Sequence, residues 1–110
     1  MEDIKEIQQL SFQIILHAGN AKSDVMNAVT LAKNSEFEEA AKKMNLAEDS
    51  FAKAHHMQTK LLQDEANGKV TELSVILIHA QDHLMNALTV KDLAVEMIDM
   101  YQKINHLEEK

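Results

Sequence analysis

Residues 3–33 read DIKEIQQLSFQIILHAGNAKSDVMNAVTLAK, and this stretch decides the fold. Apolar or small residues recur in it at alternating steps of three and four, at Ile4, Ile7, Ser11, Ile14, Ala18, Ala21, Val25, Ala28 and Ala32. In an α-helix this spacing places all of these side chains on one face. A pattern held over four heptads is typical of the seam of a coiled-coil-like bundle. The sequence therefore predicts a first long helix over about residues 3–33.

The next segment carries the same periodicity and its own start and stop signals. Ser35 followed by Glu38 matches a capping box, which predicts that a second helix begins there and runs over about residues 36–67. Its seam consists of Phe37, Ala40, Met44, Ala47, Phe51, Ala54, Gln58 and Leu61. Asn67-Gly68 supplies the residue that can adopt the left-handed conformation in which helices commonly end.

A third helix is predicted over about residues 71–105, with Thr71 as its N-cap. It shows two apolar stripes, one of Leu73, Ile76, Ala80, Ala87, Ala94, Met97 and Tyr101 and another of Leu77, Leu84, Leu88 and Ile98. A three-helix bundle buries one stripe per helix, so the second stripe needs another partner. Self-association is the simplest one.

The composition supports this architecture. With two glycines and no proline in 110 residues, little interrupts a few long helices. The fold class predicted is all-α, an antiparallel three-helix bundle in a single domain over residues 1–110, which assembles with other copies.

The charge and the residue types present exclude several functions. A formal net charge of −7 argues against nucleic-acid binding, which needs a basic face. The absence of cysteine removes disulfides, thiolate zinc sites and cysteine nucleophiles. The N-terminus does not resemble a signal peptide, and the longest aliphatic run, residues 75–78, is far too short to span a membrane. We expect no membrane insertion and a cytoplasmic location.

One cluster of residues can carry chemistry, namely His79-Ala80-Gln81-Asp82-His83. Offsets of three and four put His79, Asp82 and His83 near one another on a helix. Their spacing alone leaves three interpretations open: a metal site, since paired histidines are common zinc ligands; nucleophilic catalysis by one histidine with its neighbour in support; or polar residues on a solvated face.

Four stretches together resemble the lactose/cellobiose-type enzyme IIA family of the bacterial sugar phosphotransferase system. These are HAGNAKS at 17–23, Ala54-His55 leading to Gln58-Thr59, Glu65-Ala66 with Gly68, and HAQDHLM at 79–85. The last is the specific one, and together with the helix lengths the match covers nearly the whole chain. The resemblance implies a three-helix protomer, a homotrimer and phosphorylation of His79.

The resemblance also implies the partners and the metal. The phosphocarrier protein HPr is the expected donor, and a cysteine of the cognate IIB component is the expected acceptor. Asp82 from three subunits is expected to meet on the three-fold axis, where one Mg²⁺ per trimer can bind. His83 and Gln81 are expected to support the transfer, with Gln81 better placed for a neighbouring subunit's site.

Two rival hypotheses remain from the residues alone: a helical adaptor whose histidine cluster is incidental, and a metal-binding bundle that transfers no phosphate. The transported sugar, whether lactose, cellobiose, chitobiose or a related β-glucoside, is not encoded here, because specificity resides in the membrane component.

Overall fold

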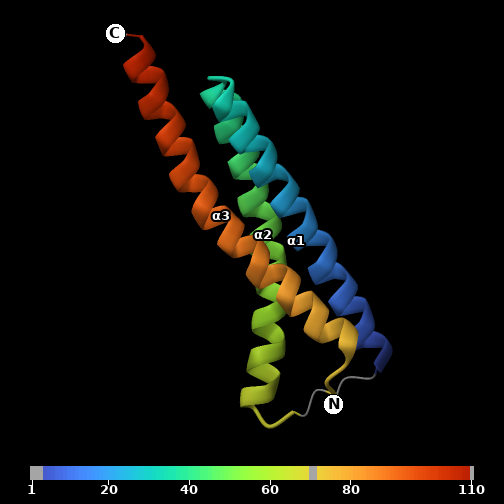
Figure 1. The fold of residues 1–110 in the computed structure, drawn as a ribbon. Helices are drawn as coiled ribbons and strands as arrows, with labels where there is room; N and C mark the ends of the chain where they lie inside the picture. Colours follow the sequence, from blue (N-terminus) through green and yellow to red (C-terminus); the bar gives the residue numbers. More distant parts are fainter. Residues whose placement is uncertain (1–3, 70–71, 110) are drawn as a thin grey trace.

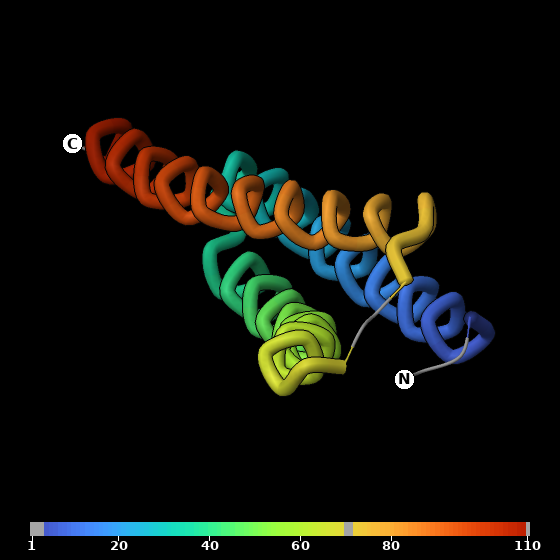
Figure 2. Tube along the Cα trace, turned by 90° about the horizontal axis from the view of Figure 1, so that it is seen from below, coloured from blue at the N-terminus to red at the C-terminus, as the bar shows by residue number. Residues whose placement is uncertain are grey.

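The computed structural model describes residues 4–69 and 72–109, which form three helices joined by short connections (Figure 1). The helices are α1 (Ile4–Lys33), α2 (Phe37–Ala66) and α3 (Val75–Glu108), running up, down and up along a rod of 62 × 21 × 19 Å. α1 packs along both other helices, whereas α2 and α3 touch only briefly and diverge at their connected ends (Figure 2). The predicted all-α antiparallel bundle is confirmed.

The seam predicted for α1 forms the centre of the core. Every predicted position from Ile7 to Ala32 is buried, and only Ile4, in the first turn, is exposed. Ser11 is the polar member of this seam, and its hydroxyl donates a hydrogen bond of 2.7 Å to the carbonyl of Ile7 in the same helix. This hydrogen bond offsets the cost of removing the hydroxyl from water, so the seam tolerates a polar residue here.

Alanines at seven-residue intervals let the three helices approach one another closely. α2 buries Ala40, Ala47 and Ala54, and α3 buries Ala80, Ala87 and Ala94. Small side chains at helix contacts reduce the distance between axes. Larger residues such as Ile14 and Leu84 then fill the space between the alanines. The register of α3 against α1 is thereby fixed, and with it the direction in which its polar residues point.

The boundary between α1 and α2 differs from the predicted capping box. Ser35 has a φ of 65°, and the backbone N–H groups of Ser35 and Glu36 bond to the carbonyls of Ala32 and Leu31. This is the left-handed closure of α1, which is incompatible with the extended backbone that an N-cap requires. Glu36 is therefore the N-cap of α2, and the Ser35 hydroxyl bonds instead to Asn105 Oδ1 at 3.0 Å.

The same closure confirms the predicted end of α2. Gly68 has a φ of 82°, and the N–H groups of Gly68 and Lys69 bond to the carbonyls of Glu65 and Asp64. A residue with a Cβ is strained at this φ, so glycine is favoured here.

The start of α3 also differs from the prediction. Thr71 lies outside the described residues, residues 72–74 are not helical, and the helix begins at Val75 and continues to Glu108. Ser74 is the N-cap, with an extended backbone and a side chain that accepts a 3.2 Å hydrogen bond from the Leu77 N–H. Serine and threonine are both favoured N-cap residues, so residue type alone does not decide between positions 71 and 74.

The predicted division of the apolar residues of α3 into two stripes is wrong. Leu77 and Leu84 of the second stripe and Ala80, Ala87 and Ala94 of the first are all buried in one face. Leu88 packs against the same core, and Ile98 packs against a second buried cluster formed by Ala28, Ala32 and Ala40. Apolar side chains nevertheless remain exposed on the side of α3 that points away from the core, where Ile78 is 58% and Met85 53% exposed. The surplus apolar surface was predicted correctly, but different residues form it.

None of the described helices combines the length with the apolar composition that crossing a bilayer requires.

Candidate functional site

His79 and His83 form a close pair on the surface of α3. Their Nε2 atoms lie 3.0 Å apart, and their rings meet edge to face, with centroids 4.4 Å apart and planes at 88°. His79 is exposed, whereas His83 is half-buried. At this distance one Nε2 carries the hydrogen and the other presents its lone pair, so the pair shares one hydrogen bond when both rings are neutral.

The core contacts of α3 hold this pair at the edge of the protein. Each histidine immediately precedes a core residue, Ala80 or Leu84, and each step along a helix rotates the side chain by 100°. Both imidazoles therefore lie on the same flank of α3, between the core and the solvent. The offset of four residues, with one helical turn between them, brings the rings together.

Asp82 lies on the side of α3 that points away from the core. It is exposed, and the apolar side chains one turn before and after it, Ile78 and Met85, are also exposed. No ion pair involving Asp82 occurs among the described residues. Asp82 is thus a charged residue on an otherwise apolar exposed stretch of α3.

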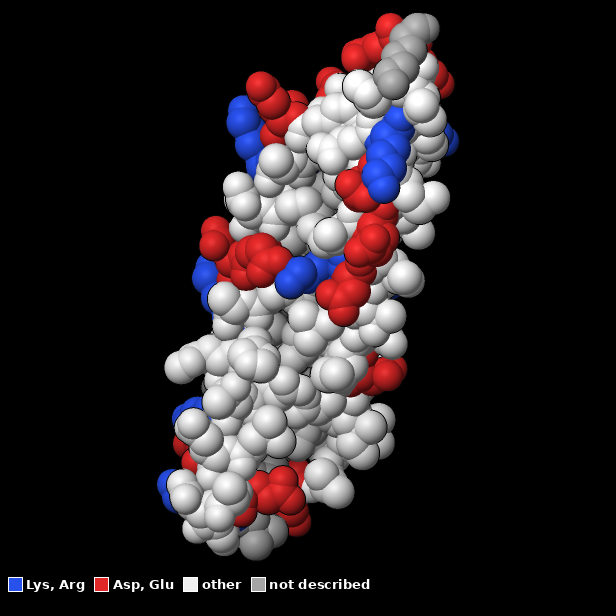
Figure 3. Space-filling view, turned by 90° about the vertical axis from the view of Figure 1, so that its left-hand side faces the viewer, with Lys and Arg blue, Asp and Glu red and all other residues white. Residues whose placement is uncertain are grey.

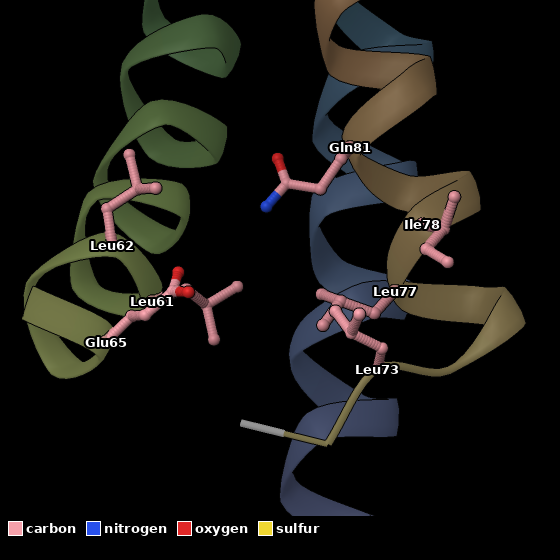
Figure 4. A pocket seen from close by; sticks show the side chains of 7 residues that line it. All are labelled: Leu61, Leu62, Glu65, Leu73, Leu77, Ile78 and Gln81. Atoms are coloured by element: carbon pink, nitrogen blue, oxygen red, sulfur yellow. The ribbon is translucent and has the colours of Figure 1, made fainter. Parts of the chain in front are cut away.

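Gln81 occupies the other flank of α3 and faces α2. Its Oε1 accepts a 2.7 Å hydrogen bond from Nε2 of Gln58 on α2. Below this contact α2 and α3 diverge around a groove of about 340 Å³, shown in Figure 4. The groove is lined by Leu61, Leu62, Glu65, Leu73, Leu77, Ile78 and Gln81.

The structure thus separates the predicted site residues into three groups. It brings His79 and His83 together, places Asp82 on the outer face, and turns Gln81 toward α2. Sequence reasoning placed Gln58 in the α2 seam but gave it no role in the site. Gln58 is the one polar residue in that predicted seam, and this was the feature of the sequence that could have drawn attention to it.

The site contains nucleophiles and hydrogen-bond donors rather than a metal centre within one chain. No three His, Asp or Glu side chains in the described residues gather closely enough to hold a metal ion. An exposed imidazole with a second imidazole beside it is suited to accepting a group on one nitrogen while the neighbour adjusts its hydrogen bond.

Residues 9–102 of the chain match the family described as "PTS system, Lactose/Cellobiose specific IIA subunit". The lichenan-specific phosphotransferase enzyme IIA component of Bacillus subtilis (strain 168) is 53% identical over 100 residues, covering 91% of each chain. The crystal structure of the cellobiose-specific enzyme IIA from Bacillus anthracis superposes with a TM-score of 0.89 at 50% identity, covering 96% of this chain and 95% of that one.

A third similar structure is the solution structure of the IIA(chitobiose)–HPr complex of the Escherichia coli phosphotransferase system. It matches with a TM-score of 0.79 at 28% identity, over 96% of this chain and 99% of that one. The matched region includes all the site residues described above and most of each helix. This chain therefore belongs to the lactose/cellobiose-specific IIA subunit family of the sugar phosphotransferase system.

Proposed function

We propose that this chain is a phosphocarrier in which His79 accepts a phosphoryl group from phospho-HPr and passes it to a cysteine of a cognate IIB component. The observation that carries the proposal is the exposed His79 ring with the His83 Nε2 at 3.0 Å, in a chain of the IIA family. The relative in complex with HPr supports HPr as the donor. The proposal includes a cytoplasmic location.

The chemistry follows from the imidazole pair. A ring nitrogen of His79 with a free lone pair attacks phosphorus, and the nitrogen–phosphorus bond forms as the bond to the donor breaks. Phosphoryl transfer passes through a loose transition state with charge on three oxygens, so nearby N–H donors stabilise it. The adjacent His83 ring supplies one such donor. In the second transfer a thiolate of the acceptor displaces His79 from phosphorus.

We propose further that the protein is a homotrimer assembled through α3. Exposed apolar side chains follow the outer face of this helix, including Val75, Ile78, Met85, Leu93 and Met100. In the part of α3 that precedes Lys91, Asp82 is the one residue of the Asp, Glu, Lys and Arg types. Figure 3 shows charged side chains gathered over the upper part of one face and few across the stretch below. The exposed apolar side chains on the outer face of α3 are suited to an interface between copies.

Asp82 is the proposed magnesium ligand on the axis of that trimer. Its carboxylate lies on the exposed apolar face, between Ile78 and Met85, and has no partner cation among the described residues. Carboxylate oxygens are the donors that Mg²⁺ prefers, so the residue fits the ion. When bound, the ion supplies positive charge that offsets the repulsion among the three carboxylates.

The phosphocarrier role is tested by incubation with phosphoenolpyruvate, enzyme I and HPr. We expect the chain to take up one phosphate per protomer, labile to acid and stable to base, because a phosphorus–nitrogen bond on histidine hydrolyses in acid. An incubation without HPr is the control. A helical adaptor or a simple metal-binding bundle takes up no phosphate, so an unlabelled chain contradicts the proposal.

The oligomeric state is tested by sedimentation equilibrium. The chain mass is 12.4 kDa, and we expect a species of about three times that mass at micromolar concentration. Ile78→Asp adds a charge at the centre of the exposed apolar face and should shift the protein toward monomer. Lys42→Asp, on the exposed face of α2, is a charge-changing control expected to leave the trimer intact. A parent protein that sediments as a monomer would falsify the trimer and, with it, the shared magnesium site.

A further inference from the structure

Gln58 is a polar residue in an otherwise apolar seam of α2, and its amide contacts polar and sulfur atoms of α3. Its Nε2 donates to Gln81 Oε1 at 2.7 Å and lies 4.0 Å from the sulfur of Met85. Both contacts reach across to α3, and both side chains of the amide pair are half-buried. The Gln58–Gln81 pair bridges α2 and α3. These two helices otherwise touch only briefly.

The direction of this hydrogen bond fixes the orientation of the Gln81 amide. A thioether sulfur can only accept, so the Met85 contact favours the nitrogen of Gln58 on that side. Gln81 must then present its oxygen to Gln58, and its NH₂ group is turned elsewhere. Figure 4 shows the Gln81 nitrogen pointing into the space between α2 and α3, on the side of the groove.

The groove offers few polar groups. Its lining is aliphatic apart from Gln81 and Glu65, and Glu65 is an exposed carboxylate that can only accept. The two N–H bonds of Gln81 are therefore the side-chain donors that the lining offers. His79 of the same chain is on the opposite flank of α3, two residues away, so these donors do not face the His79 of their own chain.

We propose that Gln58 is a positioning residue for phosphoryl transfer. It holds the Gln81 amide with its N–H donors directed into the groove, where they meet the phosphoryl oxygens on His79 of a neighbouring copy. This inference rests on the proposed function. Gln58 itself touches no reacting group and acts only by deciding which end of the Gln81 amide faces outward.

Gln58→Glu tests the proposal with nearly unchanged shape. A carboxylate at this position only accepts hydrogen bonds, so Gln81 must turn its NH₂ toward it and withdraw its donors from the groove. We expect transfer from phospho-HPr to slow about ten-fold or more, the loss associated with one hydrogen bond to a charged group. The control is Gln63→Glu, which makes the same charge change at an exposed position of α2. Gln63→Glu should keep the parent rate.

A double-mutant cycle separates positioning from a structural role. In a Gln81→Leu background, Gln58→Glu should cause no further slowing, because Gln58 has lost the group through which it acts. Gln58→Leu keeps the seam apolar, so it should fold at least as stably as the parent and still slow transfer. Equal rates for Gln58→Glu and Gln63→Glu, or equal slowing with and without Gln81, overturn the inference. Failure of the parent to take up phosphate contradicts the proposed function instead.

Discussion

His79→Ala should fold and assemble as the parent does and take up no phosphate from phospho-HPr. The side chain is exposed, and its hydrogen bond and ring contact among the described residues are with His83, so its removal should leave the core residues Ala80 and Leu84 in place. The loss of transfer should be complete, because no other group of the chain provides the same nucleophile at that place. The measurement is phosphate incorporation per protomer after prolonged incubation, together with the thermal midpoint and the sedimentation mass.

His83→Ala is the matched control, since it removes the other ring of the same pair. We expect transfer to slow by about ten- to one-hundred-fold, the usual effect of losing a hydrogen bond to a charged group, while incorporation still reaches completion. Stoichiometric labelling of His79→Ala would move the acceptor role to His83. Complete loss of labelling in both variants would contradict the division of roles proposed for the two histidines.

Asp82→Leu should raise the thermal midpoint of the proposed trimer and remove the dependence on magnesium that we propose for it. Three carboxylates about 5 Å apart on an axis repel by roughly 3 kcal/mol per pair at an effective dielectric constant of 20. No lysine lies within one turn of Asp82 to offset this repulsion. Replacing buried charges with apolar side chains is often stabilising by about 1–4 kcal/mol. At about 4 °C per kcal/mol, the midpoint should rise by several degrees.

The measurement is the thermal midpoint of both proteins in magnesium and in chelator. The parent should melt lower in chelator, and Asp82→Leu should melt at one temperature in both. Asp92→Leu, an exposed carboxylate on the same helix ten residues further on, controls for the general effect of removing charge. If Asp82→Leu melts below the chelated parent, the three carboxylates do not face one another across an axis.

The existence of the three helices and the seams of the first two could be predicted because each depends on local rules. A heptad of Ile, Val and Ala residues can bury only one face of a helix, so the positions from Ile7 to Ala32 were determined before any partner was known. Gly68 likewise marks the end of α2, because a residue with a Cβ would be strained at its φ of 82°. The helix boundaries and the contacts between helices could not be predicted as well from such local rules.

The helix boundaries show why. Ser35 has the residue type and spacing of an N-cap, yet it closes α1 in the left-handed conformation and bonds to Asn105, which is seventy residues away. On α3 the apolar residues outnumber the positions that the core can bury. Their division between the core and the outer face depends on the angle at which α3 meets α1, and a pattern within one helix carries no information about that angle.

For the candidate site, the sequence by itself determined that His79 and His83 lie one turn apart on a helix, since an offset of four residues does so in any α-helix. Only the tertiary structure decided which way each neighbour points: Asp82 outward among Ile78 and Met85, and Gln81 toward Gln58. The contact between Gln58 and Gln81 joins two helices that have no fixed relation in sequence. The packing of both helices against α1 brings these two amides within 2.7 Å, because each helix must bury its own alanine-rich seam on the same central partner.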